Sequence, residues 1–329
     1  MRRSAGPDQF KAILLTLVIF GHTYTQLQTQ DFGKWLIYGF HMPAFLFLSG
    51  FLLDADRLRA RPIGEFLKHY WKRMLAGWLV VSVVYLLLFD RGAFDSAPHA
   101  VTALALTPAF HLWYVPVLFT AVLATRLAGH VRAGRIALIA VAVLGMAVFE
   151  TPLNPMLVPS FVAGHLDHRY FGYYGWFLLG FAVRNGWLRM PARAWRLAAI
   201  VVGGAGWVAG YFGHEWAGDV GFIVLNIGVT LCVPAMVNRL ATPLPWIGAG
   251  LVRIGRYSLW VYLLHPFITG SLQVSPARPV IEQRVAGLAL TAAILVVSAA
   301  VTIPLARRRR EPVAAGADAP APAVDQVSS

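Results

Sequence analysis

Charged residues are scarce in this sequence of 329 residues, of which only 13% are Asp, Glu, Lys or Arg. A soluble domain usually carries about 25% charged residues. Acidic residues are scarcer than basic ones, with 15 Asp and Glu against 28 Lys and Arg. Hydrophobic residues make up 58% of the chain. This shortage of charge predicts that lipid, and not water, is the main solvent of the protein.

Cysteine is almost absent as well. The single cysteine, Cys232, excludes an internal disulfide and any zinc cluster built from cysteine. The net charge of +13 would favour nucleic-acid binding in a soluble protein. Here the basic residues lie between hydrophobic runs, so we expect a membrane surface as the partner and no nucleic acid.

Long hydrophobic runs are what the sequence has in abundance. A transmembrane helix needs about 20 mostly apolar residues. The candidates are residues 10–27, 35–53, 74–90, 109–126, 135–150, 170–187, 195–213, 219–239, 254–273 and 284–305. The sequence therefore predicts an all-α, polytopic membrane protein, with a bundle of about ten transmembrane helices over residues 1–306. A basic, then disordered, cytoplasmic tail is expected over residues 307–329.

The distribution of Lys and Arg orients this bundle. Of the 28 basic residues, 22 lie at the N-terminus, in alternate loops and at the C-terminal end, whereas five lie in the intervening loops. Basic residues gather on the cytoplasmic side of membrane proteins. We therefore expect both termini to be cytoplasmic.

The first apolar segment contains ionisable residues, which are expensive inside a bilayer and usually functional. Lys11 and His22 are close to three helical turns apart, so they share a face about 16 Å apart along the axis. Asp8, three residues before Lys11, is placed to pair with it. His22 is expected in the outer half of the membrane.

The second apolar segment brings a second histidine, His41, to about the depth of His22. Pro43 is expected to bend this helix and free a backbone carbonyl, which is tolerated where a helix lines a cavity. The two histidines could meet, although each could instead bond a neighbouring helix. A metal site is a rival interpretation, but two histidines without nearby carboxylates make a poor one, so no metal is predicted.

Three further motifs carry candidate site residues. Lys68, Lys72 and Arg73 would suit a phosphate-bearing ligand, although such a cluster is most often a membrane anchor. Trp113 and Tyr114 are either site residues or part of the aromatic belt at the membrane interface.

A motif in the ninth segment, Ser258 to Pro266, includes Tyr262 and His265. His265 stands in mid-helix before a proline, where a functional role and a packing role are equally compatible with the sequence.

In order along the chain, these motifs resemble those of the acyltransferase 3 family of membrane acyltransferases, and particularly its fucose-4-O-acetylase-like branch. The resemblance covers the first nine segments. Its motifs are Asp8–Lys11 with Gly21 and His22, Phe40–Phe51, Phe66–Leu75, His111–Tyr114 and Tyr262–Pro266.

The resemblance implies an activity and a location. The family moves an acyl group, most often acetyl, from cytoplasmic acyl-coenzyme A to an acceptor, commonly a hydroxyl of a cell-surface glycan or its lipid-linked precursor. It implies a bacterial-type inner membrane, His22 as catalytic residue, and Lys68, Lys72 and Arg73 as coenzyme A ligands. Two departures are expected to matter: the proline that often follows the basic cluster is absent, and we expect no esterase-like domain. Either this protein completes the transfer alone or a partner does so.

The chemistry of the residues agrees with this activity. Histidine suits a general base near neutral pH, so His22 is expected to be the base, or briefly an acyl carrier, with His41 orienting it or the acceptor. Lys11 is expected to face acetyl-coenzyme A. Asp8, Trp113, Tyr114, Tyr262 and His265 complete the predicted site.

A glycolipid transporter or flippase is the alternative, because membrane histidines also relay protons. A scaffold protein of an envelope complex is a third, and it would leave the histidines without a role. The acceptor sugar, the length of the acyl chain and the oligomeric state stay open.

Overall fold

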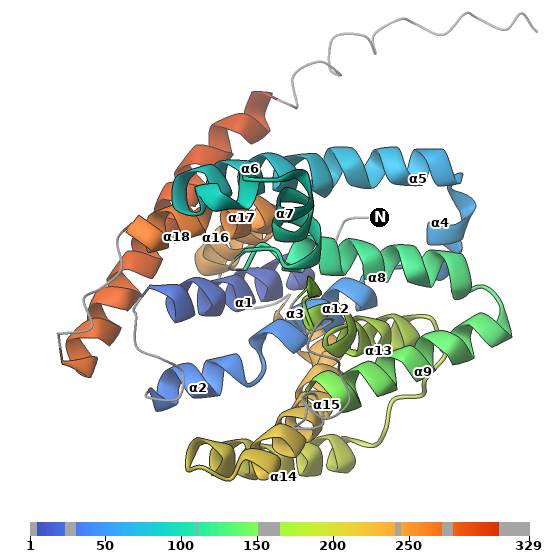
Figure 1. Cartoon of the computed structure of the whole chain (residues 1–329). Helices are drawn as coiled ribbons and strands as arrows, with labels where there is room; N and C mark the ends of the chain where they lie inside the picture. Colours follow the sequence, from blue (N-terminus) through green and yellow to red (C-terminus); the bar gives the residue numbers. More distant parts are fainter. Residues whose placement is uncertain are drawn as a thin grey trace, which may run out of the picture.

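In the computed structural model, the described residues are 5–23, 31–109, 111–150, 165–240, 245–271 and 279–308. Every regular element within these ranges is helical, as Figure 1 shows, which confirms the all-α prediction. Most of the expected tail, from residue 309 onward, lies outside the described residues, as does the N-terminal pair Arg2 and Arg3.

Each of the ten predicted segments overlaps at least one helix, although several are divided. The α-helices are α1 (Gly6–His22), α2 (Phe32–Tyr38), α3 (His41–Phe51), α4 (Ala55–Ala60), α5 (Ile63–Tyr70), α6 (Ala76–Phe89), α7 (Ala97–Val101), α8 (Tyr114–Ala128), α9 (Arg132–Phe149), α12 (Arg169–Gly172), α13 (Tyr174–Arg184), α14 (Arg193–Tyr211), α15 (Glu215–Leu240), α16 (Pro245–Arg256), α17 (Ser258–Ser271) and α18 (Val280–Arg308). Short π- and 3₁₀-helical segments are η1 (Trp71–Leu75), η2 (Arg91–Phe94) and η3 (Thr102–Leu106).

The outer surface has the character of a membrane protein. Among the described residues, four helices are long and apolar enough to cross a bilayer: Ile63–Phe89, Arg132–Phe149, Glu215–Leu240 and Ile281–Ser298. Many large apolar side chains are exposed on the surface; Val201, for example, is 71% exposed and Val296 is 67% exposed. Such surfaces are tolerated where lipid covers them. The count of about ten crossings is not confirmed and stays a prediction.

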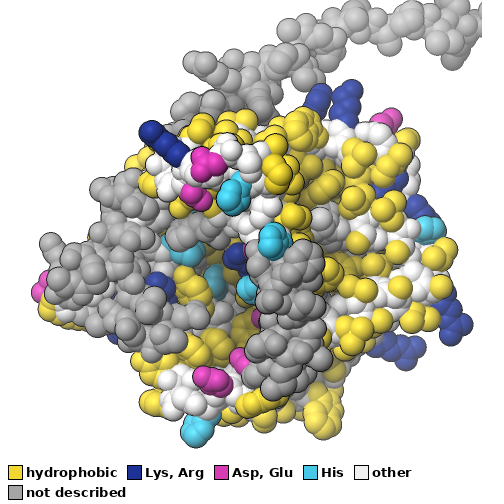
Figure 2. Space-filling view, viewed as in Figure 1, with side chains coloured by type: hydrophobic (Ala, Val, Ile, Leu, Met, Phe, Trp, Pro, Cys, Tyr) yellow, Lys and Arg dark blue, Asp and Glu magenta, His cyan; other side chains and the backbone are white. Residues whose placement is uncertain are grey.

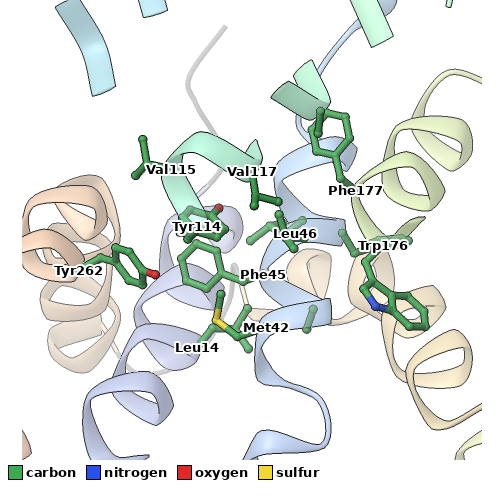
Figure 3. Packing of buried hydrophobic residues seen from close by; sticks show 14 of the residues in the cluster. Leu14, Met42, Phe45, Leu46, Tyr114, Val115, Val117, Trp176, Phe177 and Tyr262 are labelled. Carbon is green, nitrogen blue, oxygen red and sulfur yellow. The ribbon is translucent and has the colours of Figure 1, made fainter. Parts of the chain in front are cut away.

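Helix α1 lies at the centre of the bundle. It packs against α3, α15, α16, α17 and α18. Leu14, Leu15 and Ile19 are buried in this packing, and Figure 3 shows Leu14 beside Met42 and Phe45 of α3. The central position of α1 fixes where its ionisable residues lie.

The second predicted segment is broken one turn before its proline. Residues 35–53 were expected to form one helix bent at Pro43, but α2 ends at Tyr38 and α3 begins at His41. Pro43 has no N–H to donate to the carbonyl four residues earlier, that of Gly39. Asn226 of α15 donates to this carbonyl instead, at 2.7 Å. The proline therefore explains the break, and a neighbouring helix satisfies the freed group.

The third predicted segment is longer than expected. Its helix was placed at residues 74–90, but α5, η1 and α6 form one continuous helical run from Ile63 to Phe89. The basic residues Lys68, Lys72 and Arg73 consequently lie within this helix and not ahead of it. A π-helical turn, η1, contains two of them; such turns are frequent at functional sites.

Close backbone contact joins α3 to α13. A Cβ added to Gly180 would lie 2.0 Å from the carbonyl oxygen of Phe47, and one added to Gly50 equally close to that of Phe177. Small residues at helix crossings let membrane helices approach in this way. The buried aromatic cluster seen in Figure 3 fills the space beside this crossing.

Candidate active site

A large cavity of about 1180 Å³ opens between α1, α2, α14 and α15, and we call it the outer cavity. Its lining includes His22, His41, His111, Trp113 and Tyr262. Figure 2 shows histidine side chains at the bottom of a hollow in the middle of the visible face. Four of these five residues are predicted site residues; His111 is the addition.

Three histidines from distant parts of the chain form a cluster at this cavity. His22 ends α1, His111 lies in the turn before α8, and His265 lies on α17. The ring centroids are 4.8 Å apart between His22 and His111, 4.3 Å between His111 and His265, and 5.7 Å between His22 and His265. We refer to these three residues as the histidine cluster.

The backbone around the cluster holds its rings in place. The turn that carries His111 accepts two hydrogen bonds: Trp78 Nε1 donates to the Leu112 carbonyl at 2.9 Å, and the Tyr262 hydroxyl donates to the His111 carbonyl. His265 Nδ1 lies 2.7 Å from the carbonyl oxygen of Tyr262. Because a carbonyl only accepts, Nδ1 of His265 carries the hydrogen and Nε2 carries the lone pair.

The predicted partner of His22, His41, lies in the same cavity on the far side of Tyr38. The Tyr38 ring is 6.2 Å from that of His22 and 5.1 Å from that of His41. The Tyr38 hydroxyl is 3.4 Å from Nδ1 of His22, and His41 Nδ1 donates to the Ile37 carbonyl at 2.7 Å. His22 therefore has its ring contacts with His111 and His265 as well as with Tyr38.

A second cavity of about 620 Å³, the inner cavity, has a basic lining. Lys11, Arg57, Arg73 and Arg184 contribute to it. Figure 2 shows Lys and Arg side chains gathered along the edge where α4 and the α8–α9 connection lie. This cavity has the charge that would attract a polyanion.

The predicted basic residues divide between the inner cavity and the surface. Asp8 is buried and lies 3.6 Å from Lys11 and 3.7 Å from Arg256, so the expected Asp8–Lys11 pair is present. Arg73 lines the inner cavity, whereas Lys68 and Lys72 are exposed and are not part of its described lining.

Aromatic residues separate the two cavities. Tyr262 lines both of them. Its ring lies 5.3 Å from that of Tyr114, which is also 5.3 Å from Phe45 and whose hydroxyl is 2.8 Å from Oγ of Ser49. Figure 3 shows Tyr262, Tyr114 and Phe45 side by side between α17, α8 and α3. We call these three residues the aromatic wall.

An ion pair joins the start of α2 to α18. Asp31 accepts a hydrogen bond at 2.9 Å from Arg284 of α18 and another at 2.8 Å from the Lys34 backbone N–H. Burial acts to raise the pKa of Asp31, but these hydrogen bonds and the charge of Arg284 outweigh it and hold the pKa below its usual value. Burial lowers the pKa of Lys34, which lines the outer cavity.

His111, Arg57 and Arg184 line these cavities but were not among the predicted site residues. His111 belongs to the motif ending in Tyr114, but nothing in the sequence places it against His22. Arg57 and Arg184 belong to the 22 basic residues that predict the cytoplasmic side, and no motif in the sequence marks them as site residues. Their convergence on one cavity depends on the contacts of α4 and α13, which one sequence does not reveal.

The helical bundle thus contains a basic cavity and a histidine-lined cavity that share one lining residue, Tyr262. The chain matches the family model described as an acyltransferase domain, the acyltransferase 3 family, over residues 4–307. It belongs to this family, and thereby to the membrane acyltransferases. No curated protein and no solved structure matches the chain.

Proposed function

We propose that this protein is a membrane O-acetyltransferase that moves acetyl from cytoplasmic acetyl-coenzyme A to a hydroxyl of a cell-surface glycan or its lipid-linked precursor. The observation that carries the proposal is the arrangement of the two cavities, which differ in lining and share Tyr262. The finer assignment to the fucose-4-O-acetylase-like branch, in a bacterial-type inner membrane with both termini cytoplasmic, is part of the same proposal.

The inner cavity would receive the donor. Coenzyme A carries several phosphate charges at one end of a long, flexible arm and the thioester at the other. Lys11, Arg57, Arg73 and Arg184 offer positive charge for the phosphates, and arginine binds phosphate through two parallel hydrogen bonds. The arm would then extend along α1 toward the aromatic wall.

The outer cavity would receive the acceptor. Its lining combines aromatic rings, such as Trp35 and Trp207, with the carboxylates of Glu215 and Asp219. Sugars offer both apolar ring faces and hydroxyl groups, so this mixture suits a saccharide. Trp35 and Trp207 are stacked at 4.2 Å and donate to each other's carbonyls, which keeps both rings at fixed positions on the cavity wall.

His22 would perform the central step between the two substrates. It accepts the proton of the acceptor hydroxyl while the oxygen attacks the thioester carbonyl, the new C–O ester bond forms and the C–S bond breaks. The proton then passes to the departing thiolate of coenzyme A. In the alternative sequence of events, His22 first takes the acetyl group from the thioester, releasing the coenzyme A thiol, and the acceptor hydroxyl then attacks the acetyl-imidazole and frees His22. His41 would orient His22 or the acceptor through Tyr38.

The test is acetyl transfer by the purified protein in lipid nanodiscs, followed as release of the coenzyme A thiol and as a glycan heavier by one acetyl group. The His22→Ala variant should lose transfer by at least about a hundredfold, the usual contribution of a general base. His130→Ala is the matched control, because His130 is exposed and is not among the residues that line either cavity. Wild-type rates in His22→Ala would refute the assignment of His22, and unchanged glycans with altered export would favour a transporter.

A further inference from the structure

The histidine cluster has the composition of a transition-metal site, which the sequence did not predict. The sequence suggests only His22 and His41 as a pair, and two histidines without nearby carboxylates make a poor metal site. The structure brings His111 and His265 to His22, and one ring nitrogen of each lies within 4.8 Å of those of the other two. His111 and His265 are buried.

His265 offers the clearest sign of a ligand. Its Nδ1 is committed to the Tyr262 carbonyl, so the lone pair is on Nε2. Nε2 is buried and has no hydrogen-bond partner within the part of the chain that the structure describes, and the side chain is only 1% exposed. A buried acceptor without a donor is energetically unfavourable. Metal-bound histidines are typically held in this way, by a carbonyl at the other ring nitrogen.

The chemistry of the three ligands selects the ion. Three imidazoles without a carboxylate or a thiolate suit Zn²⁺ and similar borderline ions, whereas Mg²⁺ and Ca²⁺ require oxygen ligands. The His111 and His265 rings are inclined by 17° and stacked, so their lone pairs converge on one ion only after one ring turns. The outer cavity, which His22 and His111 line, gives that ring and the ion access to the site.

We propose that His22, His111 and His265 bind one Zn²⁺ ion that enters from the outer cavity, and that the bound ion reversibly blocks acyl transfer. An imidazole whose lone pair is donated to a metal cannot accept a proton, so the zinc-bound state and the base-competent state of His22 exclude each other. The inhibitory part rests on the proposed function; the binding part does not.

Cobalt titration of the purified, untagged full chain in detergent tests the binding part, because four-coordinate Co²⁺ absorbs visible light. We expect one equivalent to bind with this absorption, and one equivalent of Zn²⁺ to displace it. His265→Gln and His111→Gln should each weaken binding by at least about tenfold, whereas His130→Gln should bind as the wild type does. Absence of saturable binding, or wild-type affinity in both cluster variants, would overturn the site.

Activity measurements test the inhibitory part. Micromolar Zn²⁺ should abolish acetyl transfer, and a chelator should restore it. Stimulation of transfer by Zn²⁺, or loss of activity on chelation, would overturn the inference that bound Zn²⁺ inhibits acyl transfer. A protein that binds Co²⁺ but never transfers acetyl would refute the proposed function and leave the metal site intact.

Discussion

The hydrogen bond from Asn226 to the Gly39 carbonyl gives a quantitative prediction. Pro43 cannot donate to that carbonyl, and Ala44 already donates to Phe40, so within the described residues Asn226 supplies the donor from another helix. Asn226 is fully buried. The Asn226→Ala change should therefore leave a buried carbonyl without a partner.

Two magnitudes bound the effect of this change. Hydrogen bonds between membrane helices average about 0.6 kcal/mol, because the acceptor usually finds another donor. A buried group that finds none costs about 1–3 kcal/mol. Gly39 belongs to the second case, so we expect Asn226→Ala to lower the free energy of unfolding by about 2 kcal/mol. In a Pro43→Ala background the new N–H of residue 43 can donate to Gly39, and the same change should cost only about 0.6 kcal/mol.

The assay is a double-mutant cycle in mixed micelles, with unfolding followed through the fluorescence of the 11 tryptophans. Thr230→Ala is the matched control. Thr230 is equally buried on α15, but its hydroxyl donates to the Asn226 carbonyl of its own helix, so its cost should not depend on residue 43. Equal costs of Asn226→Ala in both backgrounds, within about 0.4 kcal/mol, would refute the explanation of the helix break.

Three further changes have defined outcomes. Gly180→Ala forces a methyl group against the Phe47 carbonyl and should lower the thermal midpoint by several degrees, measured by scanning fluorimetry; an unchanged midpoint would contradict the close α3–α13 crossing. Asp31→Asn removes the partner of Arg284. Because the pKa of Asp31 is lowered in the folded state, its stabilisation is present above about pH 4 and is lost as the pH falls through the folded pKa, so the stabilities of the variant and the wild type should converge in acid. Arg73→Ala should raise KM for acetyl-coenzyme A about tenfold with little change in kcat; the reverse pattern would place Arg73 outside the donor site.

The helices could be predicted from the sequence because a segment that crosses lipid must be helical and mostly apolar over about 20 residues, and such runs are visible in the sequence. The position of the helix break between α2 and α3 could not be predicted from the sequence. Pro43 indicated a disturbance, but its position depends on Asn226, which lies far away in the sequence and supplies the donor that lets the helix end one turn earlier.

The candidate site could be predicted only in part, because its members come together through tertiary contacts. His22 and His41 were linked by their depths along two helices, and both do line one cavity. The contacts of His22 with His111 and His265 depend on how the turn before α8 and the middle of α17 pack against α1. Depth can be inferred from a hydrophobic pattern, but the direction in which a helix turns its side chains toward non-neighbouring helices cannot.

Helix α1 sets a fixed distance between the inner and the outer cavity. It presents Lys11 to the inner cavity and His22 to the outer one, and its neighbours hold it on several sides. One residue inserted between these positions would lengthen the helix by about 1.5 Å and turn His22 by about 100° relative to Lys11. The number of residues separating Lys11 from His22 is therefore constrained by geometry, independently of which apolar residues fill the interval. Point substitutions within that interval should be tolerated far more readily than any change in its length.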